Sequence, residues 1–152
     1  MYIIHEQKQK SNPIIMFIYV IVFIVLLFNI IKNSLSGVWE ISLIIILFAD
    51  IVFFINFYQV KFKITSDGLE FGYGIFKNKV SKNNIESILI DNSKNSFFGY
   101  GIRFGKDKTI GFISKAGSGL RIIFKDKRRF FVTMNNPREA LDIIKENNYV
   151  SS

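Results

Sequence analysis

The sequence predicts a membrane protein of two parts, a transmembrane α-helical hairpin followed by an all-β barrel or sandwich of about seven antiparallel strands that a C-terminal helix caps. Three observations support this fold class. Two long apolar runs lie near the N-terminus, the sequence becomes charged and alternating after residue 58, and a short amphipathic helical pattern lies near the C-terminus. We therefore divide the chain into a cytoplasmic tail (1–12), a helical hairpin (13–58) and a β domain (59–150).

The two apolar runs cover residues 14–31 and 38–58. A helix rises about 1.5 Å per residue against a hydrocarbon core of roughly 30 Å, so each run is long enough to cross a bilayer. Ser11-Asn12-Pro13 offers a helix cap followed by proline at the first helical position, and Gly37 breaks the chain between the runs. This pattern predicts two antiparallel spanning helices, and the alternative for the first run is a cleaved signal peptide.

The lysines around the hairpin predict its orientation. Lys8 and Lys10 precede the first run. Lys61 and Lys63 follow the second run, whereas the connection holds only Lys32. Basic residues favour the cytoplasmic side of a membrane, so we expect both termini in the cytoplasm. The excess of Ile, Asn, Lys and Phe indicates a low-GC bacterial genome, so we expect the hairpin in a bacterial inner membrane.

One acidic residue, Asp50, lies in the middle of the second apolar run. A charged carboxylate in hydrocarbon costs at least about 2.5 kcal/mol, so Asp50 needs a partner or a proton. Antiparallel packing places Tyr19 at a similar depth, which predicts a hydrogen bond between Tyr19 and Asp50. The alternatives are pairing of Asp50 across a homo-oligomer, and a proton or ion relay.

Alternating apolar and polar residues predict the strands of the β domain. Val60, Phe62 and Ile64 alternate with polar residues, a Ser66-Asp67-Gly68 turn leads into the next strand, and Asp126-Lys127 is typical of a hairpin turn. The predicted strands cover residues 60–65, 69–75, 85–90, 101–104, 109–114, 120–125 and 129–134.

A cap signal predicts the C-terminal helix. Asn136 precedes Pro137 at the first helical position, and Glu139 stands at the third. Ala140 and Ile144 follow four residues apart on the same face as Pro137, so this face is expected to pack on the sheet.

Three segments resemble the bacterial PH-like (pleckstrin-homology-like) domain proteins, many of which are small membrane proteins with a helical hairpin before the domain. They are residues 99–103 (GYGIR), 119–129 (GLRIIFKDKRR) and 136–141 (NPREAL). The resemblance spans most of residues 59–148. It implies a PH-like fold that acts as a binding or scaffolding module, although a fold does not by itself specify a function.

The formal net charge of +8 belongs to the β domain, because three lysines and three acidic residues cancel in residues 1–58. Basic residues near a cytoplasmic leaflet are attracted to anionic lipid by roughly 1 kcal/mol each. Nucleic acid is not expected as a partner, because these residues are scattered among strands rather than gathered on one helix. The candidate lipid or partner surface consists of Lys61, Lys63, Arg103, Arg121, Lys125, Lys127, Arg128 and Arg129, with a merely solvated face as the alternative.

One pattern occurs twice, as FGYGI at residues 71–75 and again at 98–102. Glycines inside strands mark bulges, bends or the close approach of another backbone. Curvature of the sheet is therefore the expected role of these glycines, and a ligand groove is the alternative.

The chain contains no cysteine and one histidine, and no group of residues in it is typical of catalysis, a metal site or a bound cofactor. We expect a non-enzymatic, membrane-anchored module that recognises a protein partner or anionic lipid headgroups. One alternative is an immunity or accessory subunit that acts through its hairpin, with Tyr19 and Asp50 contacting a partner helix. A small transporter or channel subunit is the other.

Overall fold

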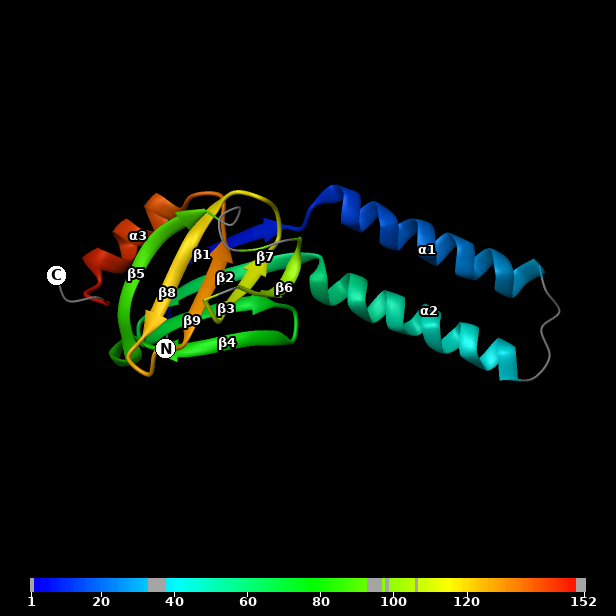
Figure 1. Ribbon diagram of the computed structural model, residues 1–152, viewed down its shortest axis with the longest axis horizontal. Coiled ribbons are helices and arrows are strands. Elements are labelled where there is room, and N and C mark those ends of the chain that lie inside the picture. The colour runs from blue at the N-terminus through cyan, green and yellow to red at the C-terminus, as the bar shows by residue number, and fades with distance from the viewer. Residues whose placement is uncertain (1, 33–37, 93–96, 98, 106, 150–152) are drawn as a thin grey trace.

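The structure is a computed structural model that describes residues 2–32, 38–92, 97, 99–105 and 107–149, and the side chains of residues 38–40 lie outside this description. Two long helices lie side by side and project from one end of a β domain, while a short C-terminal helix lies at the other end (Figure 1). The elements are β1 (Ile3–Lys10), α1 (Pro13–Lys32), α2 (Val38–Phe57), β2 (Gln59–Thr65), β3 (Gly68–Tyr73), β4 (Phe76–Ser81), η1 (Lys82–Asn84), β5 (Ile85–Asn92), β6 (Gly101–Phe104), β7 (Thr109–Ile113), β8 (Ser118–Phe124), β9 (Arg129–Thr133) and α3 (Pro137–Glu146).

The strands form two sheets, and these do not close into a barrel. Sheet A has the order β1-β2-β3-β4 and is antiparallel throughout. Sheet B has the order β5-β8-β9-β7-β6, and its β7–β9 pair is parallel. The predicted sheet-rich fold with a C-terminal helix is thus observed, with two strands more than the sequence predicted and with one pair that is not antiparallel.

The first additional strand, β1, comes from residues that the sequence analysis assigned to a tail. It pairs with the whole length of β2 in sheet A. Its positions on the inner face of the sheet are His5, Gln7 and Gln9, which lie in register with the buried face of β2. These residues are polar, so no alternation of apolar residues indicated a strand. The N-terminal segment is therefore part of the folded domain, and the tail prediction is corrected.

The second additional strand is β4, which pairs with β3 at the open edge of sheet A. Asn78 occupies the central inward-facing position between Phe76 and Val80. This polar residue interrupts the period of two on which strand prediction depends.

The hydrophobic core lies between the inner faces of the two sheets, and α3 packs against β5 and β8. Phe71 of sheet A contacts the rings of Phe112 and Phe130 of sheet B, with centroids 5.8 and 5.4 Å apart. Ala140 and Ile144 are fully buried, as the predicted helix face requires. The Asn136 side chain donates to the Glu139 carboxylate at 3.1 Å and accepts no capping hydrogen bond from the helix backbone.

The two long helices are apolar and lie outside this core. None of the side chains of α1 is buried within the protein, and Phe17 and Phe28 are 64% and 59% exposed. So large an exposed apolar surface is not expected on a helix surrounded by water. Among the described residues, α1 alone is long and apolar enough to span a membrane, because the described side chains of α2 form the shorter run Ile41–Phe57. By this criterion one span is supported and the two-span prediction is not.

Candidate membrane-proximal site

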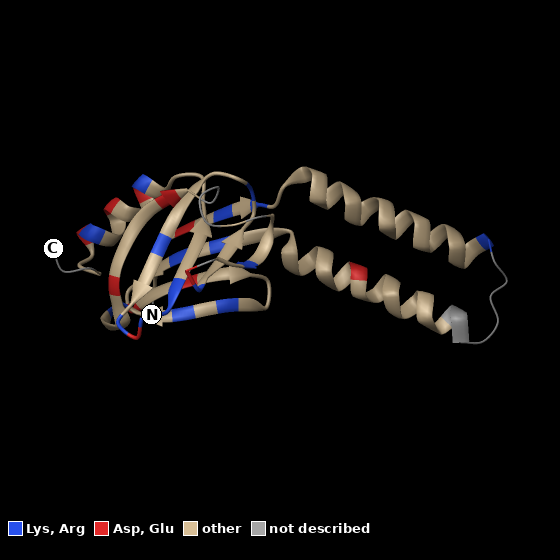
Figure 2. Ribbon diagram, viewed as in Figure 1, with Lys and Arg blue, Asp and Glu red and all other residues tan. Residues whose placement is uncertain are grey.

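The eight basic residues that the sequence groups into one surface lie in four separate places. Lys61 and Lys63 are on sheet A, Arg103 is on edge strand β6, Arg121 and Arg129 are on sheet B, and Lys125, Lys127 and Arg128 are at the β8–β9 turn. Figure 2 shows basic segments spread over the β domain and largely missing from the two long helices. These eight residues do not form one continuous patch.

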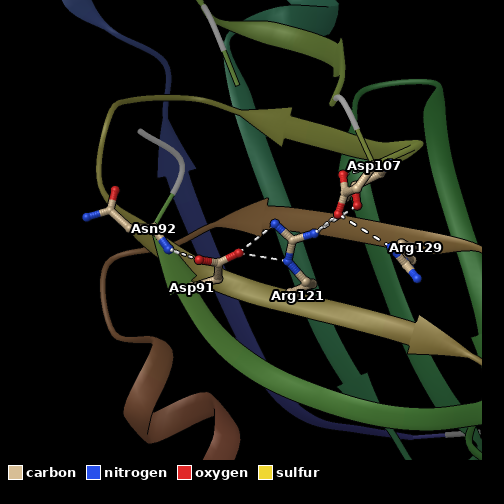
Figure 3. Close-up of polar contacts among 6 residues, drawn as sticks. Asp91, Asn92, Asp107, Arg121 and Arg129 are labelled. Atoms are coloured by element: carbon tan, nitrogen blue, oxygen red, sulfur yellow. Dashed lines mark hydrogen bonds and ion pairs between the residues drawn. The ribbon is translucent and has the colours of Figure 1, made fainter. Parts of the chain in front are cut away.

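Arg121 lies at the centre of an ion-pair network, and its side chain is 13% exposed. Its guanidinium pairs with Asp91 of β5 at 2.6 Å and also with Asp107 (Figure 3). It donates a further hydrogen bond to the Thr109 hydroxyl at 2.9 Å. Arg129 reaches the same Asp107 at 3.7 Å. Two cations of the predicted surface are thus balanced by carboxylates of the protein itself.

The pKa of Asp107 reflects this network. Burial acts to raise the pKa of Asp107, but hydrogen bonds from Thr109 and the charge of Arg121 outweigh burial and hold the pKa below its ordinary value. The Asp107 carboxylate is therefore charged at neutral pH and remains a partner for Arg121.

The β8–β9 turn lies at the end of the domain away from the two long helices (Figure 1). Lys127 pairs with Glu86 at 3.1 Å, and Arg128 pairs with Asp126 at 2.6 Å. Lys125 forms no ion pair with the described residues. This turn therefore lies far from the two helices and would not face a membrane that the helices enter.

Sheet A carries a row of lysines close to the helices. Its cross-strand order on the outer face is Lys8–Lys61–Gly72–Lys77, and no carboxylate stands in the row itself. Two of its lysines reach carboxylates of the next row, because Lys8 pairs with Glu6 at 3.6 Å and Lys77 with Glu70 at 3.8 Å. Lys10, two residues closer to α1, lies with its ammonium 5.9 Å from the centre of the Tyr58 ring. We call Lys8, Lys61 and Lys77 the proximal lysine row.

The next outward-facing row, two residues farther from the helices, is neutral. It alternates Glu6–Lys63–Glu70–Lys79. Lys63 pairs with Glu6 at 3.5 Å and Lys79 with Glu70 at 3.5 Å. Positive charge on the outer face of sheet A is therefore concentrated at the helix-proximal end.

The tip of the β3–β4 hairpin adds apolar side chains at the same end. Ile75 is 75% exposed and Phe76 is 45% exposed. The Phe76 ring packs on Phe57 of α2, with centroids 5.7 Å apart. Apolar and aromatic residues next to lysines are typical of a membrane–water boundary.

Hydrogen bonds hold the helices to the domain at this end. The Asn56 side chain of α2 accepts from the Ile75 N–H at 3.0 Å. The Ser11 N–H donates to the Tyr58 carbonyl at 2.9 Å, and the Ser11 hydroxyl donates to the Phe57 carbonyl. The start of α1 and the end of α2 are therefore fixed beside each other.

A cavity of about 290 Å³, which we call the junction cavity, lies where the two helices meet the domain. Its apolar wall comes from α1 and α2 and consists of Ile15, Met16, Tyr19, Phe53 and Phe57. The wall from the β domain and the preceding linker consists of Ser11, Tyr73, Tyr100, Gly101, Ile102 and Arg103. One side of the cavity is thus apolar, and the other offers hydroxyls and one cation.

The polar wall offers hydrogen-bond donors and an available charge. Arg103 is exposed and, unlike Arg121, forms no ion pair with the described residues. Burial raises the pKa of the Tyr73 hydroxyl, against the opposing effects of Ser11 and Arg103, so this hydroxyl stays protonated. An anion is the ligand that such a wall can accept.

Both copies of the repeated glycine pattern reach this cavity, because Tyr73 and Tyr100 both line it. Gly74 has φ +37° and Gly101 has φ +88°, backbone conformations that favour glycine. The repeat therefore bends the chain at two places that face one cavity. Phe98, which begins the second copy, lies outside the described residues.

Tyr19 and Asp50 line a second cavity of about 230 Å³ between α1 and α2. Both residues therefore face one cavity, and the predicted hydrogen bond between them is not present among the described residues. The Tyr19 ring packs edge-on against Phe54, with centroids 6.4 Å apart.

No family model matches this chain, and no similar protein was found among curated proteins or solved structures. The PH-like resemblance therefore depends on the sequence segments alone.

Sequence reasoning missed the grouping of the proximal lysine row. Lys8 and Lys77 belong to it because β1 and β4 are strands, and neither strand was predicted. The charge pattern of Lys8 and Lys10 was visible, but it indicated helix orientation rather than a place on a sheet.

Proposed function

We propose that this chain is a non-enzymatic, PH-like binding module of a bacterial inner membrane, anchored by both long helices, whose helix-proximal end contacts anionic lipid headgroups. The observation that carries this proposal is the net positive charge beside the helices: the proximal lysine row holds three lysines, and Glu6 and Glu70 of the neutral row beyond it are shared between Lys8 and Lys63 and between Lys77 and Lys79.

Distances support the contact with headgroups. A strand rises about 3.3 Å per residue, so Lys61 lies about 10 Å beyond Tyr58, or roughly one Debye length. At roughly 1 kcal/mol for each basic residue, the three lysines supply at most about 3 kcal/mol of attraction, and the pairing of Lys8 with Glu6 and of Lys77 with Glu70 reduces this sum. The neutral row lies farther out, where screening would have weakened any excess charge.

The geometry of the junction supports a second span. Residues 11 and 58 are joined by a hydrogen bond of 2.9 Å, so the chain leaves the domain through α1 and returns to the same point through α2. If α1 crosses a membrane, α2 has to cross back. The lysines beside the two helix ends favour a cytoplasmic location of both termini under the positive-inside bias.

The test uses the full-length chain, which has no cysteine and so accepts a single label. A fluorophore on Ile75→Cys is quenched by brominated lipid that lies near it. Two nanodisc preparations are compared, one with brominated phosphatidylglycerol and one with the same fraction of brominated phosphatidylcholine. We expect stronger quenching by phosphatidylglycerol. This excess should fall when Lys8, Lys61 and Lys77 are changed to Gln.

A matched control changes Lys63, Lys79 and Lys127 to Gln, which removes the same charge at positions farther from the helices. The excess quenching should persist in this variant. Equal quenching by the two lipids, or an equal loss in both triple variants, would overturn the proposal.

A second function, an accessory subunit that acts through its hairpin, is favoured by the position of Asp50. This acidic side chain lines an apolar cavity between α1 and α2, where it can anchor a polar group of another helix or of a second copy. Asp50→Leu should then abolish photocrosslinking between helices of neighbouring chains in membranes and leave the lipid preference at Ile75→Cys unchanged.

A further inference from the structure

We propose that the junction cavity binds one anionic phospholipid, with its phosphate at Arg103 and the first part of its acyl chains against the apolar wall of α1 and α2. This inference deepens the proposed function and depends on it for the position of the bilayer. The inferred site differs in kind from the proposed headgroup contact, because the proximal lysine row attracts many lipids loosely whereas the cavity holds one.

The charge of the cavity selects the headgroup. Arg103 presents a planar guanidinium that suits the oxygens of a phosphate, and no described carboxylate competes for it. The nearby side chain of Gly99 is a hydrogen, and a methyl group there would lie 3.2 Å from the Arg103 Nε. Glycine at this position therefore lets the guanidinium pack closely on the backbone beside the cavity that Arg103 lines.

The hydroxyl groups add specificity. Tyr73 is 1% exposed and its hydroxyl stays protonated, so it can donate to a phosphate oxygen. Tyr100 lines the same wall from the second copy of the glycine pattern. A phosphate between these groups would receive hydrogen bonds from sheet A and from the β6 segment of sheet B at once.

The opposite wall selects an amphiphile over a free anion. Ile15, Met16 and Phe53 belong to the domain-proximal turns of the helices, which is the level where acyl chains begin if the helices span the bilayer. Tyr19 lines both the junction cavity and the cavity between the helices, so the apolar wall continues into the hairpin. The volume of about 290 Å³ is at the lower end of small-molecule sites and accommodates a headgroup rather than a whole lipid.

The experiment measures lipid retained by the full-length protein. Detergent-purified protein is delipidated, titrated with phosphatidylglycerol or phosphatidylcholine, and examined by native mass spectrometry. We expect one phosphatidylglycerol for each chain. Arg103→Gln should weaken its retention about tenfold or more, because a charge-assisted hydrogen bond is lost. Arg103→Lys should retain part of the affinity, and Arg128→Gln, at the far turn, should retain all of it.

A second readout locates the lipid. A phosphatidylglycerol with a photoreactive group near the start of its acyl chain should crosslink to Ile15, Met16 or Phe53, and not to Phe48, which is 67% exposed on α2. Glycerol phosphate without acyl chains should not compete.

Equal retention of the two lipids, unchanged retention in Arg103→Gln, crosslinking spread over the helices, or full competition by glycerol phosphate would each overturn the inference. The two proposals fail separately. If the cavity binds no lipid, the excess quenching at Ile75→Cys should still depend on the proximal lysine row. If the lysine row proves not to attract anionic lipid, the single retained lipid should still depend on Arg103.

Discussion

The side chain of Asn56 in the last turn of α2 accepts a hydrogen bond from the backbone N–H of Ile75, at 3.0 Å. The same side chain donates to the Val52 carbonyl at 2.8 Å. Gly74 makes this contact possible, because a Cβ there would lie 2.8 Å from the Asn56 Cα. One residue thus joins a helix that is exposed to lipid in the proposed topology to the hairpin tip beside the proximal lysine row.

This contact predicts that Asn56→Ala loosens the junction between helices and domain. The hydrogen of the Ile75 amide should exchange with deuterium faster, and the free energy of unfolding in detergent should fall by about 1 kcal/mol. Asn29→Ala is the matched control, because Asn29 makes the same bond to the carbonyl four residues earlier, at 2.8 Å, without contacting the domain. Equal exchange at Ile75 in both variants would show that the Asn56 bond does not couple the two parts.

The ion-pair network predicts that Arg121 stabilises the domain. Arg121→Gln leaves Asp91 and Asp107 without their main cation, so we expect a loss of about 2 kcal/mol in the free energy of unfolding. Arg128→Gln removes an exposed pair and should change stability by less than about 0.5 kcal/mol. Chemical denaturation of both variants measures the difference, and similar stabilities would contradict the structural role of Arg121.

The lowered pKa of Asp107 predicts a loss of stability in acid. A carboxyl group whose folded pKa is below its unfolded value, about 3.9, stabilises the protein above that value and loses this contribution as the pH falls through the folded pKa. Stability should therefore decline as the pH drops below about 4. Asp107→Asn should be less stable at neutral pH and show a shallower decline, as measured by unfolding midpoints from pH 6 downward.

The buried amide of Gln9 predicts a stabilising substitution. Gln9 is 4% exposed, and neither atom of its amide has a hydrogen-bond partner among the described residues. Gln9→Met keeps the length of the side chain and removes this cost, so the free energy of unfolding should rise by about 1 kcal/mol. Gln7→Met should gain less, because the Gln7 side chain donates to the Asn136 carbonyl at 3.2 Å.

The proposed orientation predicts which positions can be labelled from outside the cell. Lys32→Cys, at the end of α1 far from the domain, should react with a membrane-impermeant maleimide in intact cells. Asp126→Cys, at the β8–β9 turn, should react only after the cells are opened. Labelling of Asp126→Cys in intact cells would place the β domain outside and exclude the orientation.

Periodic patterns in the sequence determined much of the fold. The apolar run at residues 14–31 became α1, and the alternation from Val60 onward became β2 and β3. The Asn136-Pro137 signal located the start of α3. These elements were predictable because one face or the whole surface of each is apolar, and this pattern is local in the sequence.

Only the tertiary structure decided the rest, because the information lay in neighbours distant along the chain. β1 presents polar residues inward and became a strand through the free edge of β2. Arg121 looked like part of an open basic surface until its partners, Asp91 and Asp107, were brought to it from other segments. The sequence by itself determined a long apolar helix followed by a basic β domain. The pairing of strands and charges decided which of those cations lie beside the helices and which of them face carboxylates.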